Sequence, residues 1–494
     1  MPPARLWLRF FPISLGMWLN NARLSRGYIR EGIMVQLTPE MKRLVDSENG
    51  TVSREIFWNQ DIYDQEMEQV FNRSWLFVGH ESQVPEPGDF FLGRMGEEAV
   101  VVSRGRDGKI YVFLNSCRHR GNRVCRYDQG NSFTHVCSFH GWTYDATGAL
   151  VALPYHENGY DLMDKSQWGL LQARVEIFQG SIWATWDKTA PNFHEYLGGS
   201  DFYLATGLMH TDGSDNGAEV LGGVVKWRLG CNWKVPCPDT DTTHGWITHR
   251  STALALGVGA TGNPVRPRDD RSISVGQTRS RYTVSFPEGH TMGVTIPEAD
   301  DPGWGESGTW AERPAVREYL REKFEERKKR LGLMAHLSVG PAIFPNEGWL
   351  GRVVRIMHPQ GPAMTEIWTY FFVDKDAPQE VKTELANYYE LYYGPGGVTQ
   401  QDDMENWYAL TIASKGPVAQ KLDLNYQMRL SEPPLHGPTE FDMPGLFAHN
   451  YSDENHRRYY QRWAEVMQAK DWGEMAPTGS AATRNDWMTN RNGK

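Results

Sequence analysis

Two short runs of sequence constrain this chain more than any other feature, because each holds one cysteine and one histidine. The first run carries Cys117 and His119 as a Cys-x-His pair. After seventeen intervening residues, the second run carries Cys137 and His140 as a Cys-x2-His pair. Thiolates and imidazoles on tight loops are ligands for zinc or for iron. The spacing therefore predicts one metal centre with four protein ligands.

The order of the four ligands indicates which centre this is. A Cys2His2 zinc finger places both cysteines on one turn and both histidines on the other. Here each run supplies one of each, as in a Rieske [2Fe–2S] centre, where two Cys bind one iron and two His bind the other. A mixed-ligand zinc site and chance placement are the alternatives. Ser138 and Asn122 stand where respiratory Rieske proteins carry extra cysteines, so the pattern resembles the Rieske type of oxygenases.

Composition excludes several classes of protein. The chain has 494 residues with only five cysteines, and 51 Lys and Arg against 61 Asp and Glu give a net charge of −10. Five cysteines are too few for a disulfide scaffold of this length. An acidic chain lacks the clustered positive charge of nucleic-acid-binding proteins. The apolar stretch from Leu6 to Leu19 is shorter than the roughly 20 residues of a spanning helix. We therefore expect a cytoplasmic protein that binds neither nucleic acid nor membrane.

The length and texture of the chain predict more than one domain. We expect residues 1–33 to be a non-native or disordered N-terminal extension, with translation starting at Met34. Residues 34–74 are expected to form helices, including amphipathic ones from Ser53 onward, that pack on the larger, C-terminal domain. Short β-branched and aromatic runs predict an antiparallel β domain at residues 75–187, and residues 188–494 mix strands with helices.

Particular elements follow from local signals. Strands are predicted at residues 99–103, 110–114, 173–178 and 181–186, with turns at Asp107-Gly108 and Asp145–Gly148. Helices are predicted at residues 315–331, directly after Pro314, and at residues 454–470.

A second constellation lies about a hundred residues downstream of the first. Asn232-Trp233-Lys234 is followed by Asp241, His244 and His249. Two histidines five residues apart can reach one point through an irregular turn. A non-haem Fe(II) site needs two histidines and one carboxylate, and a cluster that delivers electrons needs an acceptor. The residues alone leave Asp402, Asp403 and Glu405 open as the carboxylate.

The combined pattern resembles the α (large, catalytic) subunit of Rieske non-haem iron aromatic-ring-hydroxylating dioxygenases, from about residue 53 to residue 472. The resemblance implies a mononuclear iron held by His244, His249 and Asp403, the last in a Gly-rich stretch that ends in an Asp-Asp pair. It implies an α+β fold, in which the antiparallel β Rieske domain is joined to a helix-grip (START/Bet v1-like) catalytic domain. It also implies that Asp241 connects His140 of one subunit to His244 of the next in a trimer.

The activity implied by the resemblance is addition of both atoms of O2 to an aromatic ring to give a cis-dihydrodiol. Residues 257–262 match a dinucleotide-binding pattern, but Pro264 prevents the helix that such a site requires. Electrons from NADH are therefore expected through a separate reductase and ferredoxin. A small β subunit and an α3 or α3β3 assembly are implied as well.

Other kinds of Rieske protein fit the same motifs, and two parts of the sequence differ from the pattern of the family. A Rieske monooxygenase or O-demethylase would use the same metals, and an electron carrier with a vestigial iron site is an alternative of another class. Gln400 stands where many relatives carry Glu, and the segment from Val235 to Thr240 is about two residues shorter than in those relatives. The substrate stays open between aromatic hydrocarbons and aromatic acids. Arg352, Arg355 and His290 could anchor a carboxylate, but the role of an ordinary strand residue fits each of them better.

Overall fold

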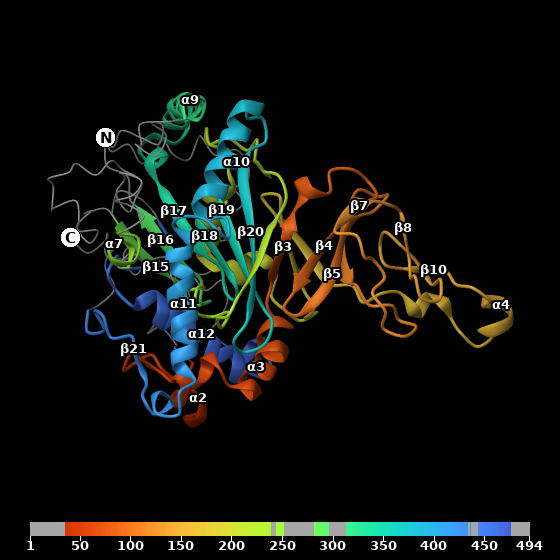
Figure 1. The fold of residues 1–494 in the computed structure, drawn as a ribbon, viewed down its shortest axis with the longest axis horizontal. Coiled ribbons are helices and arrows are strands. Elements are labelled where there is room, and N and C mark those ends of the chain that lie inside the picture. Colours follow the sequence, from red (N-terminus) through yellow and green to blue (C-terminus); the bar gives the residue numbers. More distant parts are fainter. Residues whose placement is uncertain are drawn as a thin grey trace. The chain divides into compact units, whose positions relative to one another are not determined.

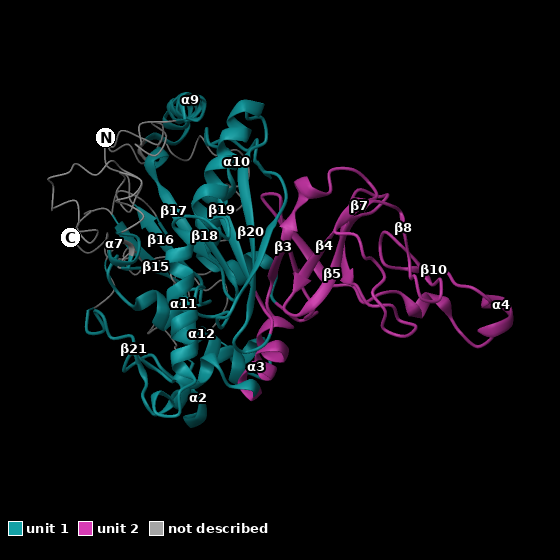
Figure 2. Ribbon diagram, viewed as in Figure 1, with its two compact units in different colours: residues 1–60, 191–357, 361–494 teal, residues 61–190, 358–360 magenta. Residues whose placement is uncertain are grey.

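The computed structural model describes residues 35–238, 244–250, 281–295, 313–432, 435 and 443–475. The chain divides into two compact units, which Figure 2 colours separately. The smaller unit consists of residues 61–190 and 358–360, and the larger unit takes the remaining residues on both sides. The predicted N-terminal extension, residues 1–33, lies outside the described residues.

The smaller unit is built from short antiparallel strands that follow the β-branched and aromatic runs of the sequence. In chain order they are β3 (Leu76–His80), β4 (Asp89–Met95), β5 (Glu98–Arg104), β6 (Ile110–Leu114), β7 (Gln129–Asn131), β8 (Thr134–Val136), β9 (Thr143–Asp145), β10 (Leu150–Ala152), β11 (Arg174–Phe178) and β12 (Ser181–Thr185). They form three sheets, in the orders β6-β5-β4-β7, β10-β9-β8 and β11-β12-β3. The four strands predicted in this region and both turns are confirmed. A short helix, α4 (His156–Gly159), follows β10.

The smaller unit begins at Asp61, earlier than the predicted boundary at residue 75. Short helices are present as expected, namely α3 (Gln60–Glu66) and the π-helical turn η4 (Met67–Phe71). The Tyr63 hydroxyl donates to Glu97 at 2.5 Å, and the Phe71 ring lies against Gly96 in the β4–β5 turn. These contacts join residues 61–74 to the smaller unit, whereas residues 35–60 belong to the larger unit, as expected for the whole of residues 34–74.

The larger unit carries a second set of antiparallel strands. They are β1 (Val45–Asp46), β2 (Thr51–Val52), β13 (Ala218–Val220), β14 (Val225–Leu229), β15 (Arg281–Ser285), β16 (Thr291–Thr295), β17 (Ser338–Ala342), β18 (Glu347–Leu350), β19 (Val353–Pro359), β20 (Thr365–Asp374), β21 (Leu424–Asn425) and β22 (Leu446–His449). One sheet has the order β13-β20-β19-β18, with β14 also paired to β20, and a second has the order β17-β16-β15-β22. Gly340 of β17 lies against the Trp349 carbonyl of β18, so the two sheets meet there.

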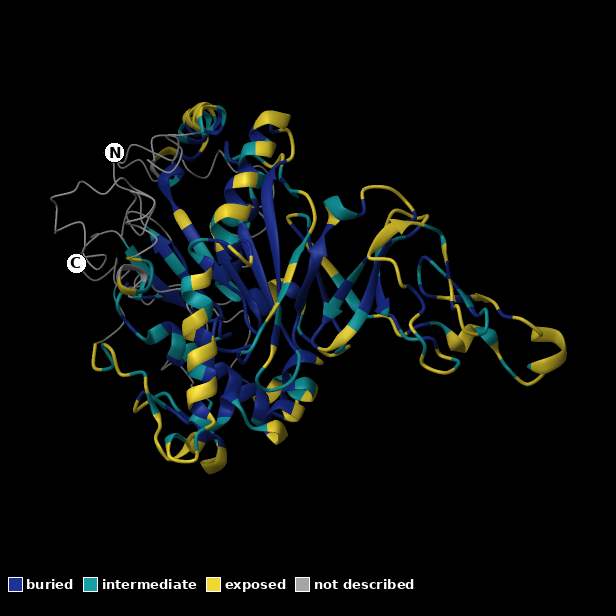
Figure 3. Ribbon diagram, viewed as in Figure 1, coloured by how far each residue is buried: buried dark blue, intermediate teal, exposed yellow. Residues whose placement is uncertain are grey.

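Helices cover these sheets (Figure 1). The α-helices of the larger unit are α2 (Pro39–Leu44), α5 (Phe193–Leu197), α6 (Asp201–Leu208), α7 (Gly245–Thr248), α9 (Pro314–Leu331), α10 (Gln379–Tyr393), α11 (Gln400–Ser414) and α12 (Glu454–Gln468). Apolar side chains of α9 and α10 pack with those of β19 and β20 in one core, and α12 contacts β15 and β16. Both predicted long helices, now α9 and α12, are confirmed. Figure 3 shows buried strands and helices with one exposed face, as amphipathic sequences require.

No helix among the described residues combines the length and apolar character needed to cross a bilayer.

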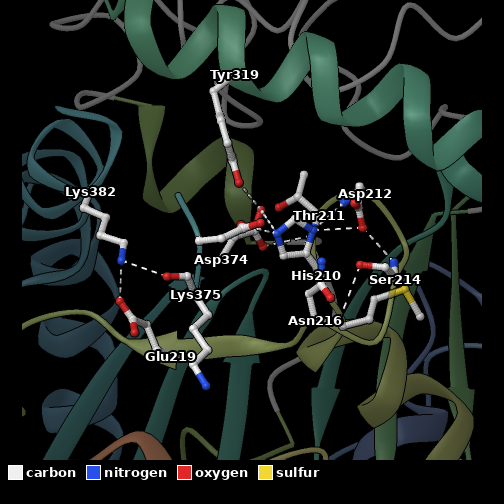
Figure 4. Close-up of polar contacts among 12 residues, drawn as sticks. His210, Thr211, Asp212, Ser214, Asn216, Glu219, Tyr319, Asp374, Lys375 and Lys382 are labelled. Atoms are coloured by element: carbon white, nitrogen blue, oxygen red, sulfur yellow. Dashed lines mark hydrogen bonds and ion pairs between the residues drawn. The ribbon is translucent and has the colours of Figure 1, made fainter. Parts of the chain in front are cut away.

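A buried polar cluster ties the end of β20 to α9 and to the loop after α6 (Figure 4). The Asp374 carboxylate accepts the N–H of Thr211 and the hydroxyl of Tyr319, each at 2.8 Å, and pairs with Arg352 at 2.9 Å. The fully buried His210 ring lies 3.5 Å from the same carboxylate. Burial alone would raise the pKa of Asp374, but Arg352 and Thr211 outweigh burial and lower it. This carboxylate therefore holds several elements together as an anion.

Asp374→Asn is expected to lower the free energy of unfolding at pH 7 by about 3 kcal/mol, because it leaves the Arg352 charge without its carboxylate. The lowered pKa means that the contribution is complete above the ordinary aspartate pKa, about 4, and is lost as the pH falls below it. Urea unfolding of wild type and Asp374→Asn from pH 7 to pH 3 measures this loss, because the free energies of unfolding of the two proteins should become similar at low pH. As a control, Glu219→Gln removes a more exposed ion pair to Lys382 and should cost less than about 1 kcal/mol. Equal stability of Asp374→Asn and wild type at pH 7 would contradict the role.

Candidate functional site

The two Cys-His runs fold into loops with matching backbone hydrogen bonds. In the first loop, the Cys117 N–H donates to the Asn122 carbonyl at 2.8 Å, and the Gly121 N–H donates back to Cys117 at 2.9 Å. In the second loop Cys137 makes the same two bonds, with Trp142 and Gly141 and at the same distances. Both glycines have positive φ, 76° and 73°, a conformation that favours glycine. The sequence thus closes two equivalent loops, after β6 and between β8 and β9.

The predicted cluster ligands lie together at these loops. Both cysteines are buried, whereas His119 and His140 are partly exposed, with ring centroids 4.4 Å apart. The His119 ring stacks on Trp142, and its Nδ1 atom is buried without a hydrogen-bond partner. A buried imidazole nitrogen without a partner fits a metal ligand, because such an orphan otherwise costs free energy. The residues present therefore fit a [2Fe–2S] cluster with thiolates inward and imidazoles outward.

Tyr144 adds a contact that the sequence analysis missed. Its hydroxyl accepts the Arg118 N–H at 3.1 Å and lies 3.3 Å from Cys117 Sγ. A thiolate that binds the cluster has no proton, so in that state the hydroxyl would donate to the sulfur. Burial, followed by the contact with Cys117, raises the pKa of Tyr144, which keeps that proton in place. The amide of Asn122 similarly donates to Cys137 Sγ at 3.6 Å. Tyr144 alternates with half-buried neighbours like an ordinary strand residue, so no sequence signal distinguishes it.

Tyr144→Phe is expected to lower the reduction potential of the cluster by about 60 mV, the one-electron equivalent of about 1.4 kcal/mol. The reason is that a hydrogen bond to a ligand sulfur stabilises the more negative, reduced state. A redox titration followed by the visible spectrum measures the shift. Tyr160→Phe is the matched control, because Tyr160 packs on the same Trp142 ring at 5.9 Å. Equal potentials for Tyr144→Phe and wild type would contradict the assignment.

The three remaining cysteines are buried free thiols. Burial raises the pKa of Cys125, and it raises the pKa of Cys231 to about 12. Cys237 is shifted in the same direction, again mainly by burial. None of the three takes part in either constellation.

The second constellation comes together in the larger unit. His244 precedes α7 and its carbonyl caps that short helix, while His249 follows α7 directly. Asp403 lies in the first turn of α11, and its Oδ1 atom is 3.5 Å from His244 Nε2 and 3.2 Å from His249 Nε2. One ligand atom from each of these three residues lies within 4.8 Å of the other two. This is the only such group of His, Cys, Asp or Glu among the described residues, and it fits one metal ion.

The two other acids near Asp403 lie in different surroundings. Asp402 Oδ2 lies 3.1 Å from His249 Nδ1, the ring nitrogen that points away from Asp403, and Glu405 is exposed. Burial alone would lower the pKa of His249, but the carboxylates of Asp403 and Asp402 outweigh burial and raise it. Asp402 therefore fixes the orientation of the His249 ring. Asp241, the predicted bridge between subunits, lies outside the described residues, as do residues 257–262 with their glycine pattern.

A short, tightly packed loop between α10 and α11 places Asp403 beside His244 and His249. Between α10 and α11, Val398 N–H donates to the Leu391 carbonyl at 2.9 Å, and Thr399 Oγ1 donates to the Tyr392 carbonyl at 2.8 Å. A Cβ atom on Gly397 would lie 2.6 Å from the Tyr392 carbonyl, so only glycine fits there. Glycine is thus needed in this stretch because two backbone segments approach each other closely just before α11.

Comparisons with known proteins agree with these features. The family model described as "Rieske [2Fe-2S] domain" matches residues 74–176. Biphenyl dioxygenase subunit alpha of Paraburkholderia xenovorans (strain LB400) is 38% identical, over 89% of this chain and 96% of that protein. Benzene 1,2-dioxygenase subunit alpha of Pseudomonas putida is 35% identical, over 89% of this chain and 96% of that protein. A structure of naphthalene 1,2-dioxygenase with indole bound matches 90% of this chain and 97% of that chain, with a TM-score of 0.76 and 28% identity. The chain belongs to the catalytic α subunits of the Rieske non-haem iron aromatic-ring-hydroxylating dioxygenases.

Proposed function

We propose that His244, His249 and Asp403 hold the mononuclear Fe(II) at which O2 is activated in this terminal oxygenase. The observation that carries the proposal is the meeting of these three side chains, with ligand atoms within 4.8 Å, in a chain that also holds a Rieske domain. Two histidines and one carboxylate leave coordination positions open for O2, which is the chemistry that such an iron supplies. The product is a cis-dihydrodiol that carries both atoms of one O2 molecule.

The protein side chains divide the remaining tasks. Cys117, Cys137, His119 and His140 hold the [2Fe–2S] cluster, with its histidine side nearest to the solvent. Asp402 accepts the Nδ1 proton of His249, which leaves Nε2 free as the ligand atom. The catalytic unit is proposed to be a helix-grip fold, which suits its antiparallel sheets covered by helices.

An aromatic hydrocarbon of one or two rings is the proposed substrate. The relatives described above carry biphenyl, benzene and naphthalene in their names. The polar contacts of three side chains support this choice over an aromatic acid. Arg352 pairs with Asp374, Arg355 donates to Gln400, and the His290 ring is held between Tyr196 and Phe344. The side chains that we considered as carboxylate anchors therefore have protein partners.

Electrons are proposed to come from NADH through a separate reductase and ferredoxin. We further propose a small β subunit, an α3 or α3β3 assembly and a cytoplasmic location. Cys125, Cys231 and Cys237 as free thiols fit a reducing compartment.

Product analysis under 18O2 tests the function directly. The purified protein, with a surrogate reductase and ferredoxin, is supplied with a panel of benzene, biphenyl, naphthalene and benzoate. We expect a hydrocarbon cis-dihydrodiol in which both oxygens come from one O2 molecule. One labelled oxygen per product would instead favour the monooxygenase alternative. Iron analysis separates the electron-carrier alternative, since an oxygenase holds about three iron atoms per chain and a carrier about two.

A further inference from the structure

A buried arginine on the sheet contacts α11 at two points. Arg355 lies in β19 and is 6% exposed. Its Nη1 atom donates to the Oε1 atom of Gln400 at 3.0 Å, and its guanidinium lies over the Trp407 ring, 5.3 Å from the centroid. Gln400 and Trp407 are themselves buried, at 1% and 6% exposure. One side chain on a rigid sheet thus holds a hydrogen bond and a cation–π contact to the same helix.

The two contact points bracket the carboxylate of the iron site. Gln400 precedes Asp403 by three residues, and Trp407 follows it by four. Residues at these spacings share one side of an α-helix. Arg355 therefore contacts α11 one turn before and one turn after Asp403, and it opposes both rotation and sliding of that turn.

We propose that Arg355, with Gln400 and Trp407, is a positioning device that sets the rotation of α11 and hence the direction of the Asp403 carboxylate. The inference rests on the proposed iron site. The first turn of α11 has no side-chain cap at Thr399, so Arg355 supplies order that a cap would otherwise give. Because residue 400 is Gln, this contact is a hydrogen bond to an amide oxygen rather than an ion pair.

Fe(II) affinity is the measurement that tests this role. The apoprotein, with its cluster intact, is titrated with Fe(II) against a chelating competitor, and the nitric oxide adduct of the bound iron is recorded by electron paramagnetic resonance. Arg355→Met keeps the bulk but loses both contacts, and Gln400→Leu loses only the hydrogen bond. We expect Arg355→Met to weaken Fe(II) binding about 10–100-fold, and Gln400→Leu less, with an altered adduct signal in both. Gln400→Glu keeps the acceptor and should bind Fe(II) within a few-fold of wild type.

Controls separate positioning from general destabilisation. Arg327 is also buried, and it donates to the carbonyls of Ala335 and Thr211, away from α11. Arg327→Met is expected to lower the thermal unfolding temperature but to leave the Fe(II) affinity unchanged. Wild-type affinity and adduct signal in both Arg355→Met and Gln400→Leu would overturn the inference. If Arg355→Met does not fold, Gln400→Leu decides alone. Unchanged Fe(II) binding in Asp403→Ala would instead overturn the proposed iron site itself.

Discussion

Asp403→Ala is expected to lose the mononuclear iron and all dioxygenation while it keeps the Rieske cluster. The side chain supplies an oxygen 3.2 Å from His249 Nε2 and 3.5 Å from His244 Nε2, so its removal leaves two of three protein ligands. Loss of an outer-shell partner typically costs 10–100-fold in metal affinity, so loss of a direct ligand should cost more than about 100-fold. Iron analysis should fall from about three to about two atoms per chain, with an unchanged cluster absorption spectrum.

The adjacent acid provides a matched control. Asp402→Asn changes a carboxylate that lies 3.1 Å from Nδ1 of His249, the ring nitrogen that points away from Asp403. We expect this variant to keep its iron at high Fe(II) concentration, with an affinity about 10–100-fold weaker than wild type. A third iron atom retained in Asp403→Ala, or lost equally in both variants, would contradict the roles assigned to the two acids.

The second large effect is expected at Asp241, which the family resemblance places between His140 of one subunit and His244 of the next. Asp241→Asn should keep both metal centres loaded but lower turnover by more than about 100-fold. A carboxylate that accepts from a ligand imidazole fixes its tautomer, and an amide in the same place breaks that polar path.

A single-turnover experiment isolates the electron transfer. In Asp241→Asn, a cluster reduced with dithionite should stay reduced when substrate and O2 are added, whereas the wild-type cluster should reoxidise. Asp239→Asn, in the same segment, serves as the control and should reoxidise normally. Normal turnover of Asp241→Asn would exclude the bridging role.

Much of this fold could be predicted because its signals are local. The alternation of one cysteine and one histidine in each run is enough to indicate a Rieske centre, since zinc fingers order their ligands differently. Pro314 predicts the start of α9, and the β-branched run of β5 predicts a strand. Proline fixes its own φ, and branched side chains suit a pleated surface.

Other features depend on contacts between distant residues and could not be predicted. The residues alone left Asp402, Asp403 and Glu405 equivalent, because their difference lies in how α11 is rotated toward α7. Tyr144 could not be recognised either, because its role depends on the sulfur of a residue twenty-seven positions earlier in the chain. The observed domain boundary at Asp61 differs from the predicted one at residue 75 for the same reason, because Tyr63 and Phe71 contact residues of the β4–β5 turn.

The burial of the thiols outside the cluster has a consequence for chemical durability. Oxidants attack the thiolate rather than the thiol, and they attack exposed groups first. With the pKa of Cys231 at about 12 and the pKa values of Cys125 and Cys237 raised as well, these sulfurs remain protonated and shielded. In an enzyme that uses O2, burial and protonation thus protect these three cysteines from oxidation. Oxidation of these three cysteines in air is therefore expected to be slow.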